Sequence, residues 1–191
     1  MSETLTRRRL GGAALVLAGL VIAGVILWPA ISGGGDDPPA SAATPVRLVS
    51  VPDLGIAFAH PRSWTRTVKG KVIRLRSPGG AAIMTFASPV AGRKPKDVKA
   101  ALLRGLRERL KPSTVVREGP GQLGRRTATT FEITGLSPVG RERALALVED
   151  TKYRTYAITL LTPARPSRKR LLEATQILAS VRLTKPLASK K

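Results

Sequence analysis

The feature that most constrains this chain is an uncharged apolar run near its start. Leu10–Ile31 is a stretch of 22 residues without a charged side chain. At about 1.5 Å per residue, a helix of this length spans the roughly 30 Å hydrocarbon core of a bilayer. The sequence therefore predicts one transmembrane helix, preceded by a short stub at residues 1–9, and makes the lipid bilayer the first expected partner.

Charges on either side of this run predict its orientation. Arg7–Arg9 stand directly before it, and Asp36 and Asp37 follow shortly after it. Arginine clusters next to a transmembrane helix stay on the cytoplasmic side. We therefore expect a single-pass protein of the cell membrane, with a cytoplasmic N-terminus and an extracytoplasmic C-terminal part.

Three alternatives to this anchor remain open. A cleaved signal peptide fits the basic start and the small residues Ala40–Ala42, although its apolar core is usually about 7–15 residues long. Thr6–Leu10 resembles a twin-arginine export signal, but two glycines follow where bulkier residues are usual. An inverted helix would instead keep the C-terminal part inside the cell.

Composition divides the rest of the chain into three parts. Residues 32–45 are rich in glycine, proline and alanine, which predicts a flexible linker. Residues 46–184 are enough for one domain with its own hydrophobic core. Residues 185–191 form a basic tail.

The spacing of apolar residues predicts an α+β domain. Helical periodicity favours helices at Lys96–Leu110 and at about Ser167–Val181. Strands are predicted at Val46–Val51, Ile56–Ala59, Val72–Ser77, Ala82–Ser88, Arg126–Thr134, Arg143–Glu149 and Thr155–Thr162. This order predicts an antiparallel-rich sheet flanked by two helices rather than a series of βαβ units.

The charge of the domain restricts the sign of its partners. Three of the 33 basic and three of the 12 acidic residues precede Thr44, so the rest of the chain carries the whole net charge of +21. Such a surface attracts an anionic envelope polymer, lipid headgroups or an acidic protein. Arginine outnumbers lysine 22 to 11 and asparagine is absent, so codon usage in a high-GC genome accounts for part of this excess.

Basic residues at predicted strand ends and at one helix start are the candidate anion-binding residues. They are Arg74, Arg76, Arg125, Arg126, Arg141, Arg143, Arg168, Lys169 and Arg170. If they converge, they form one anion-binding face. The domain has six aromatic residues, most at inward strand positions, which leaves few platforms for stacking bases. A non-specific nucleic-acid binder is therefore a less favoured alternative.

The sequence contains no recognisable catalytic constellation. Without cysteine, thiol catalysis and cysteine-ligated zinc are excluded. His60 is the only histidine and lies near Ser63 and Asp53, so an envelope hydrolase using His60 and Ser63 is the alternative function. The ordinary interpretation of a histidine directly before a proline is a structural role. We expect no enzymatic activity, metal or cofactor.

Gly119–Gly124 spells the pattern G-x-G-x-x-G. A nucleotide-binding loop of this type requires a helix directly after it. Here Arg125–Thr134 has the pattern of a strand, and Pro120 lacks the amide that would donate to a phosphate. We interpret the segment as a turn.

Three local patterns resemble the PsbP-like family, named for an extrinsic protein of photosystem II. The first is Gly55–Trp64, GIAFAHPRSW, similar to the family opening G-hydrophobic-x-F-x-Y-P-x-x-W, with His60 where tyrosine is usual. The second is Gly124–Ala128, which leads into a strand. The third is Tyr153–Thr162, followed by a proline break and a helix that ends at Ile177–Val181.

The resemblance covers Val46–Leu183 and implies an α/β/α sandwich around an antiparallel sheet. The superfamily also contains a Ran-binding nuclear import factor and many bacterial envelope lipoproteins, most of them binding or assembly factors. The resemblance therefore implies a non-enzymatic binding module and assigns no functional residue. Bacterial relatives are often lipid-anchored, whereas this chain is expected to use a protein helix.

Overall fold

The computed structural model describes residues 45–88 and 93–187. The strands are β1 Val46–Val51, β2 Ile56–Pro61, β3 Thr65–Lys69, β4 Val72–Arg76, β5 Ile83–Ala87, β6 Ser113–Leu123, β7 Arg126–Ser137, β8 Gly140–Asp150, β9 Thr155–Pro163 and β10 Arg182–Leu183. The helices are α1 Pro95–Arg109 and α2 Arg168–Ser180, with short 3-10 turns η1 Pro52–Leu54 and η2 Pro78–Gly80.

The predicted stub, the predicted transmembrane helix, the linker up to Thr44 and residues 188–191 of the tail lie outside the described residues. Within residues 45–88 and 93–187, neither helix is long and apolar enough to cross a bilayer. In the remainder of the tail, the Leu187 amide donates to the Pro52 carbonyl at 3.0 Å.

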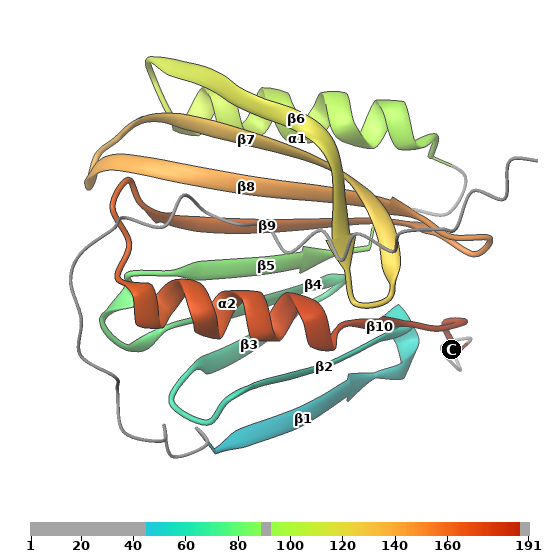
Figure 1. Ribbon diagram of the computed structural model, residues 1–191. Coiled ribbons are helices and arrows are strands. Elements are labelled where there is room, and N and C mark those ends of the chain that lie inside the picture. The colour runs from blue at the N-terminus through green and yellow to red at the C-terminus, as the bar shows by residue number, and fades with distance from the viewer. Residues whose placement is uncertain (1–44, 89–92, 188–191) are drawn as a thin grey trace, which may run out of the picture.

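Seven strands form the main sheet in the order β3-β4-β5-β9-β8-β7-β6, and all neighbours are antiparallel (Figure 1). Because successive side chains of a strand point to opposite faces, the sheet has two apolar faces to cover. Helix α1 covers one of them. Its buried Val98 and Leu106 pack in one cluster with Phe131, Ala144 and Ala146 of the sheet.

Helix α2 and a second sheet cover the opposite face. Ala174 and Ile177 of α2 pack in one cluster with Leu145 and Leu147, which alternate with the residues beneath α1. The second sheet has the order β1-β2-β10. Phe58 of β2 stacks on Phe86 of β5, with ring centroids 4.7 Å apart, and so joins both sheets in one core.

The predicted α+β class, with antiparallel sheets and two helices, is confirmed. All seven predicted strands and both helices are present, with ends shifted by a few residues. The sequence patterns did not reveal β3, β6 and the short β10. All five residues of β3 are exposed because it is an edge strand, and so it lacks the alternation of buried and exposed positions that reveals a strand.

The interpretation of Gly119–Gly124 as a turn is wrong. Residues up to Leu123 belong to β6, and the reversal falls at Gly124 and Arg125. Pro120 is compatible with a strand because β6 is the outer strand of the described main sheet, where a missing amide donor is tolerated. Gly121 is needed because a Cβ atom there would overlap the Thr130 side chain on β7.

Gly124 has a specific structural task at the β6–β7 turn. Its amide donates to the Leu178 carbonyl at 2.9 Å and so caps the end of α2. Its φ is +58°, a left-handed conformation that favours glycine, and a Cβ atom there would overlap the Val181 carbonyl oxygen. The second resembling motif, Gly124–Ala128, thus begins with a residue that no other type can replace without strain.

We expect Gly124→Ala to reduce the free energy of unfolding by more than the about 1–2 kcal/mol that a left-handed alanine costs alone, because the Val181 backbone cannot move aside. Gly70→Ala is the matched control, since Gly70 has a φ of +55° and no atom lies within 4 Å of the point that an alanine Cβ would occupy. Urea denaturation of both variants measures the difference. Equal losses would contradict the role of the close approach.

Candidate functional site

Seven of the nine predicted anion-binding residues lie on β4, in the first part of β8 and in the first turn of α2, whereas the other two lie beside the C-terminus of α2. We call the larger group the basic end; its members are Arg74, Arg76, Arg141, Arg143, Arg168, Lys169 and Arg170. Val139 of the β7–β8 turn lines the same surface hollow as Arg76. The Ala164 amide, just before α2, donates to the Arg141 carbonyl at 2.9 Å. Arg125 and Arg126 lie elsewhere, beside the C-terminus of α2.

Strand β4 places Arg74 and Arg76 on the surface because its residues alternate. Ile73 and Leu75 are buried on the α2 side, so Arg74 and Arg76 point to the other side. Each is flanked by threonines: Thr67 and Thr85 lie opposite Arg74, and Thr65 lies opposite Arg76. Helix α1 packs over β7, β8 and β9 on this side of the sheet. In the described part of the chain, the β3–β4 region of this face therefore remains exposed.

A surface hollow of about 590 Å³ lies beside Arg76. Ser63, Thr65 and Ser77 are among its lining residues, and the Arg76 side chain lies beside Gly80 of η2. The Thr65 hydroxyl donates to the Arg76 carbonyl at 3.4 Å, and the Ser77 hydroxyl donates to the Pro78 carbonyl at 3.5 Å. No acidic residue is among its described lining residues. The Arg76 guanidinium offers several donors and suits carboxylate or phosphate oxygens.

Ion pairs within the domain determine which arginine and lysine side chains remain free to bind an anionic partner. Each buried glutamate in the described residues is held by an arginine; the pairs are Glu132–Arg143, Glu142–Arg109, Glu149–Arg126 and Glu173–Arg170. Exposed Lys99 and Glu118 form a fifth pair. Three of the nine predicted residues, Arg126, Arg143 and Arg170, therefore neutralise buried carboxylates.

The other six predicted residues form no ion pair within residues 45–88 and 93–187. They are Arg74, Arg76, Arg125, Arg141, Arg168 and Lys169. Five of them lie at the basic end. Two, Arg168 and Lys169, stand in the first turn of α2, where the helix dipole disfavours cations, so the fold itself gains nothing from their charge.

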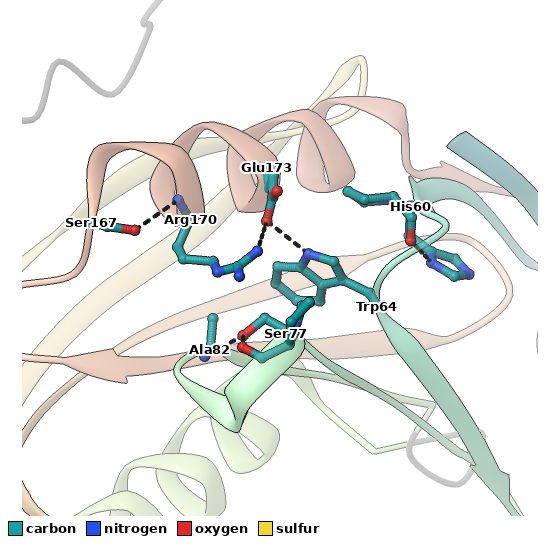
Figure 2. Close-up of polar contacts among 9 residues, drawn as sticks. His60, Trp64, Ser77, Ala82, Ser167, Arg170 and Glu173 are labelled. Carbon is teal, nitrogen blue, oxygen red and sulfur yellow. Dashed lines mark hydrogen bonds and ion pairs between the residues drawn. The ribbon is translucent and has the colours of Figure 1, made fainter. Parts of the chain in front are cut away.

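A buried polar cluster holds α2 beside the basic end (Figure 2). The Glu173 carboxylate, 4% exposed, accepts from the Trp64 indole at 2.9 Å and from the Arg170 guanidinium at 2.7 Å, both on Oε2. Sequence reasoning missed this cluster. Its signal was present, since Glu173 is the sole acid of α2 and falls within the apolar stripe, next to Ala174 and one turn before Ile177.

Replacing Trp64 with phenylalanine removes the indole donor and leaves the buried carboxylate with Arg170 as its described partner. We expect a loss of about 1–3 kcal/mol in the free energy of unfolding, measured by chemical denaturation. Leu172→Ala on the same helix is the control, because Leu172 is 55% exposed and should change stability by no more than about 0.5 kcal/mol. A Trp64→Phe variant as stable as this control would show that the hydrogen bond is dispensable.

The structure places His60 in the core rather than at a surface. The ring is 1% exposed, its Nδ1 lies 2.8 Å from the Pro61 carbonyl oxygen, and its Nε2 has no hydrogen-bond partner among the described residues. A general base must reach the proton that it removes. The alternative of a hydrolase using His60 and Ser63 therefore lacks a histidine that reaches solvent in this arrangement.

Burial lowers the pKa of His60 below its ordinary value of 6.5; the hydrogen bond to Pro61 opposes this, and the charges of Arg47 and Arg66 add to it. The folded protein therefore binds a proton less readily than the unfolded chain. As pH falls below about 6.5, the unfolded state gains protons first and stability decreases until the folded pKa is reached.

We expect the free energy of unfolding of the wild type to decrease from about pH 7 to about pH 5 relative to that of His60→Phe. Burial also raises the pKa of Glu149, which acts in the opposite direction, but this contribution is common to both proteins and cancels in the difference. Denaturation curves across the pH range test this. Parallel pH profiles would contradict it.

Across residues 45–88 and 93–187, no three or more His, Cys, Asp or Glu side chains are grouped so that they could hold a metal ion.

The class that these features define is a small α+β domain with a PsbP-like fold and a basic end. The solution structure of cyanobacterial PsbP (CyanoP) from Synechocystis sp. PCC 6803 is similar, with a TM-score of 0.54 and 13% identity, over 78% of this chain and 98% of that protein. A crystal structure from Bacteroides thetaiotaomicron VPI-5482 has a TM-score of 0.53 and 12% identity over 72% of this chain.

This chain spans 48% of the Bacteroides protein, about half its length. No protein-family model and no curated protein matches the sequence. The PsbP-like fold expected from the sequence resemblance is confirmed by these structures. At such low identities the likeness concerns the fold alone, so function has to be argued from the site.

Proposed function

We propose that this chain is a membrane-anchored, extracytoplasmic member of the PsbP-like superfamily that acts as a binding or assembly module without enzymatic activity. Its basic end would bind an anionic envelope polymer or an acidic protein surface. The observation that carries the proposal is the group of cations at the basic end that no described acid neutralises. The Leu10–Ile31 run and the charges around it support the anchor.

The geometry of the basic end favours an extended partner. Arg74 and Arg76 are two residues apart on one face of β4, about 7 Å along the strand, and neighbouring strands lie about 4.8 Å apart. Arg141 at the start of β8 and Arg168 and Lys169 at the start of α2 supply further cations. A chain with repeated phosphate or carboxylate groups can contact several of these cations at once, with a gain from counterion release.

The surface suits nucleic acid less well. Five of the six aromatic residues of the domain are buried, and Tyr153, 38% exposed, is the remaining one. It lies near β9, on the β8–β9 turn, rather than among the cations of the basic end. Single-stranded nucleic acid is usually bound by aromatic stacking together with charge. Charge without stacking platforms supports a partner recognised by its anionic groups.

The triple variant Arg76→Gln/Arg141→Gln/Arg168→Gln tests the proposal in the purified full-length chain. Polyphosphate and poly-L-glutamate are the probes, one for each anionic group. We expect weaker binding, and a slope of log K against log salt that is smaller by about two to three, because three contacts with condensed counterions are lost. Fluorescence anisotropy of the labelled polymers over a salt series measures both quantities.

The matched control is Arg104→Gln/Arg107→Gln/Lys111→Gln, which removes the same charge from the surface formed by α1 and the residues just after it. It should leave most of the binding intact. If both triple variants lose affinity equally, the net charge rather than the basic end is responsible, and the proposed site is wrong. A preference for one probe identifies the anionic group of the partner.

A further inference from the structure

The outward face of the small sheet exposes apolar side chains next to the linker. Val46 and Leu48 of β1 are 54% and 79% exposed, although they belong to a regular strand. They point away from the core because Val49, with the opposite parity, is buried against Phe58. Leu48 lies opposite Ala59 of β2, so the face continues onto small apolar residues.

A groove of about 770 Å³ runs along this face toward the C-terminus of α2. We call it the small-sheet groove. Leu48, Ala57, Ala59 and Leu183 contribute apolar surface, and the arginines at its border are Arg125, Arg126 and Arg182. Arg125 is in the β6–β7 turn and Arg126 begins β7; this turn lies against the end of α2 in Figure 1. The groove therefore combines an apolar floor with a cationic rim.

The positive charge of the rim is not fully neutralised by acidic residues of the described chain. Arg126 lies 3.5 Å from Glu149 and is half exposed. Neither Arg125 nor Arg182 forms an ion pair with any described residue. Arginine side chains next to exposed aliphatic ones match the boundary of a bilayer, where phosphates lie directly above acyl chains.

We infer that the small-sheet groove docks the domain onto the surface of an anionic lipid bilayer. β1 begins at Val46, directly after the 14 residues of the predicted linker. A flexible linker of that length has a root-mean-square span of about 20 Å. The tether thus presents this strand first to the membrane and supplies a high effective concentration of lipid. The inference uses the anchor of the proposed function but not the partner of the basic end.

Two alternative roles for this face lead to different expected results. Arg125 and Arg182 could serve the C-terminal dipole of α2, in which case their loss lowers stability but leaves lipid contact unchanged. β1 has one neighbour in the described sheet, so its free edge could pair with β1 of a second copy. In that case the face is covered by protein rather than lipid.

The chain has no cysteine, so a single introduced thiol can carry an environment-sensitive fluorophore. Ser50→Cys places it on the outward face, opposite Ala57. Val139→Cys, at the basic end and 82% exposed, is the matched control. The full-length chain is reconstituted into vesicles of phosphatidylcholine alone or with about one-third phosphatidylglycerol, and some acyl chains carry bromine as a quencher.

We expect a blue shift and bromine quenching of the Ser50→Cys probe in anionic vesicles, a smaller response in neutral ones and none at Val139→Cys. Leu48→Gln should abolish the quenching. Arg125→Gln/Arg182→Gln should lower the ratio of docked to undocked domain about 25-fold, since each basic residue near an anionic surface contributes about five-fold. Melting temperatures of both variants, compared with the parent, check that the fold is retained.

Flotation separates the possible failures. If the chain does not float with the vesicles, the anchor fails, and docking fails with it. If it floats but the Ser50→Cys probe does not respond, the docking inference alone is overturned. Quenching at Val139→Cys instead would mean that the basic end contacts lipid, and energy transfer between copies labelled at Ser50→Cys would mean that a second copy covers β1. Each of these results also overturns the inference.

Discussion

The Glu173 carboxylate, buried under the first turns of α2, accepts hydrogen bonds from Trp64 and Arg170 and so fixes the start of the helix to the turn between β2 and β3. At the other end, the Gly124 amide bonds to the Leu178 carbonyl. Both surfaces considered for binding depend on these contacts. The start of α2 contributes to the basic end, and its last residues line the small-sheet groove.

The buried glutamates explain how a domain of such high charge can fold. Isolated buried carboxylates are strongly unfavourable, and an arginine partner offsets much of that penalty. Each buried glutamate described here uses one arginine, and most of the remaining cations are left at the surface. Their mutual repulsion opposes the compact state, which an anionic partner would relieve. The same charge imbalance therefore limits stability and favours binding.

The parts of the fold that follow from local patterns could be predicted from the sequence. Strands with one buried face, such as β4, and both helices show their periodicity directly. β3 and β6 could not be predicted in this way because edge strands need neither alternation nor uninterrupted amide donors. The roles of Gly121 and Gly124 depend on close approaches to Thr130 and Val181, which are distant in the sequence.

The basic residues of the candidate site could be predicted from the sequence, but which of them are free to bind a partner could not. In the sequence, nothing distinguishes Arg126 from its neighbour Arg125, or Arg143 from Arg141. Arg126 pairs with Glu149 and Arg143 with Glu132 because of strand register and side-chain direction, which only the fold determines. His60 shows the same limit. Its place before proline suggested a structural role, but its burial depends on how β2 packs against the main sheet.

Charge alone cannot orient this domain at a membrane, because cations without acidic partners lie at both ends of α2. Orientation at the membrane requires a second, short-range interaction, the burial of apolar side chains in lipid, that differs between the two ends of α2. Val46 and Leu48 supply it at the small sheet, where they continue onto Ala59. At the basic end, Val139 is the exposed large apolar residue of the β7–β8 turn. In the proposed arrangement, the apolar strand selects the face that meets lipid, and the basic end is left free for an anionic partner.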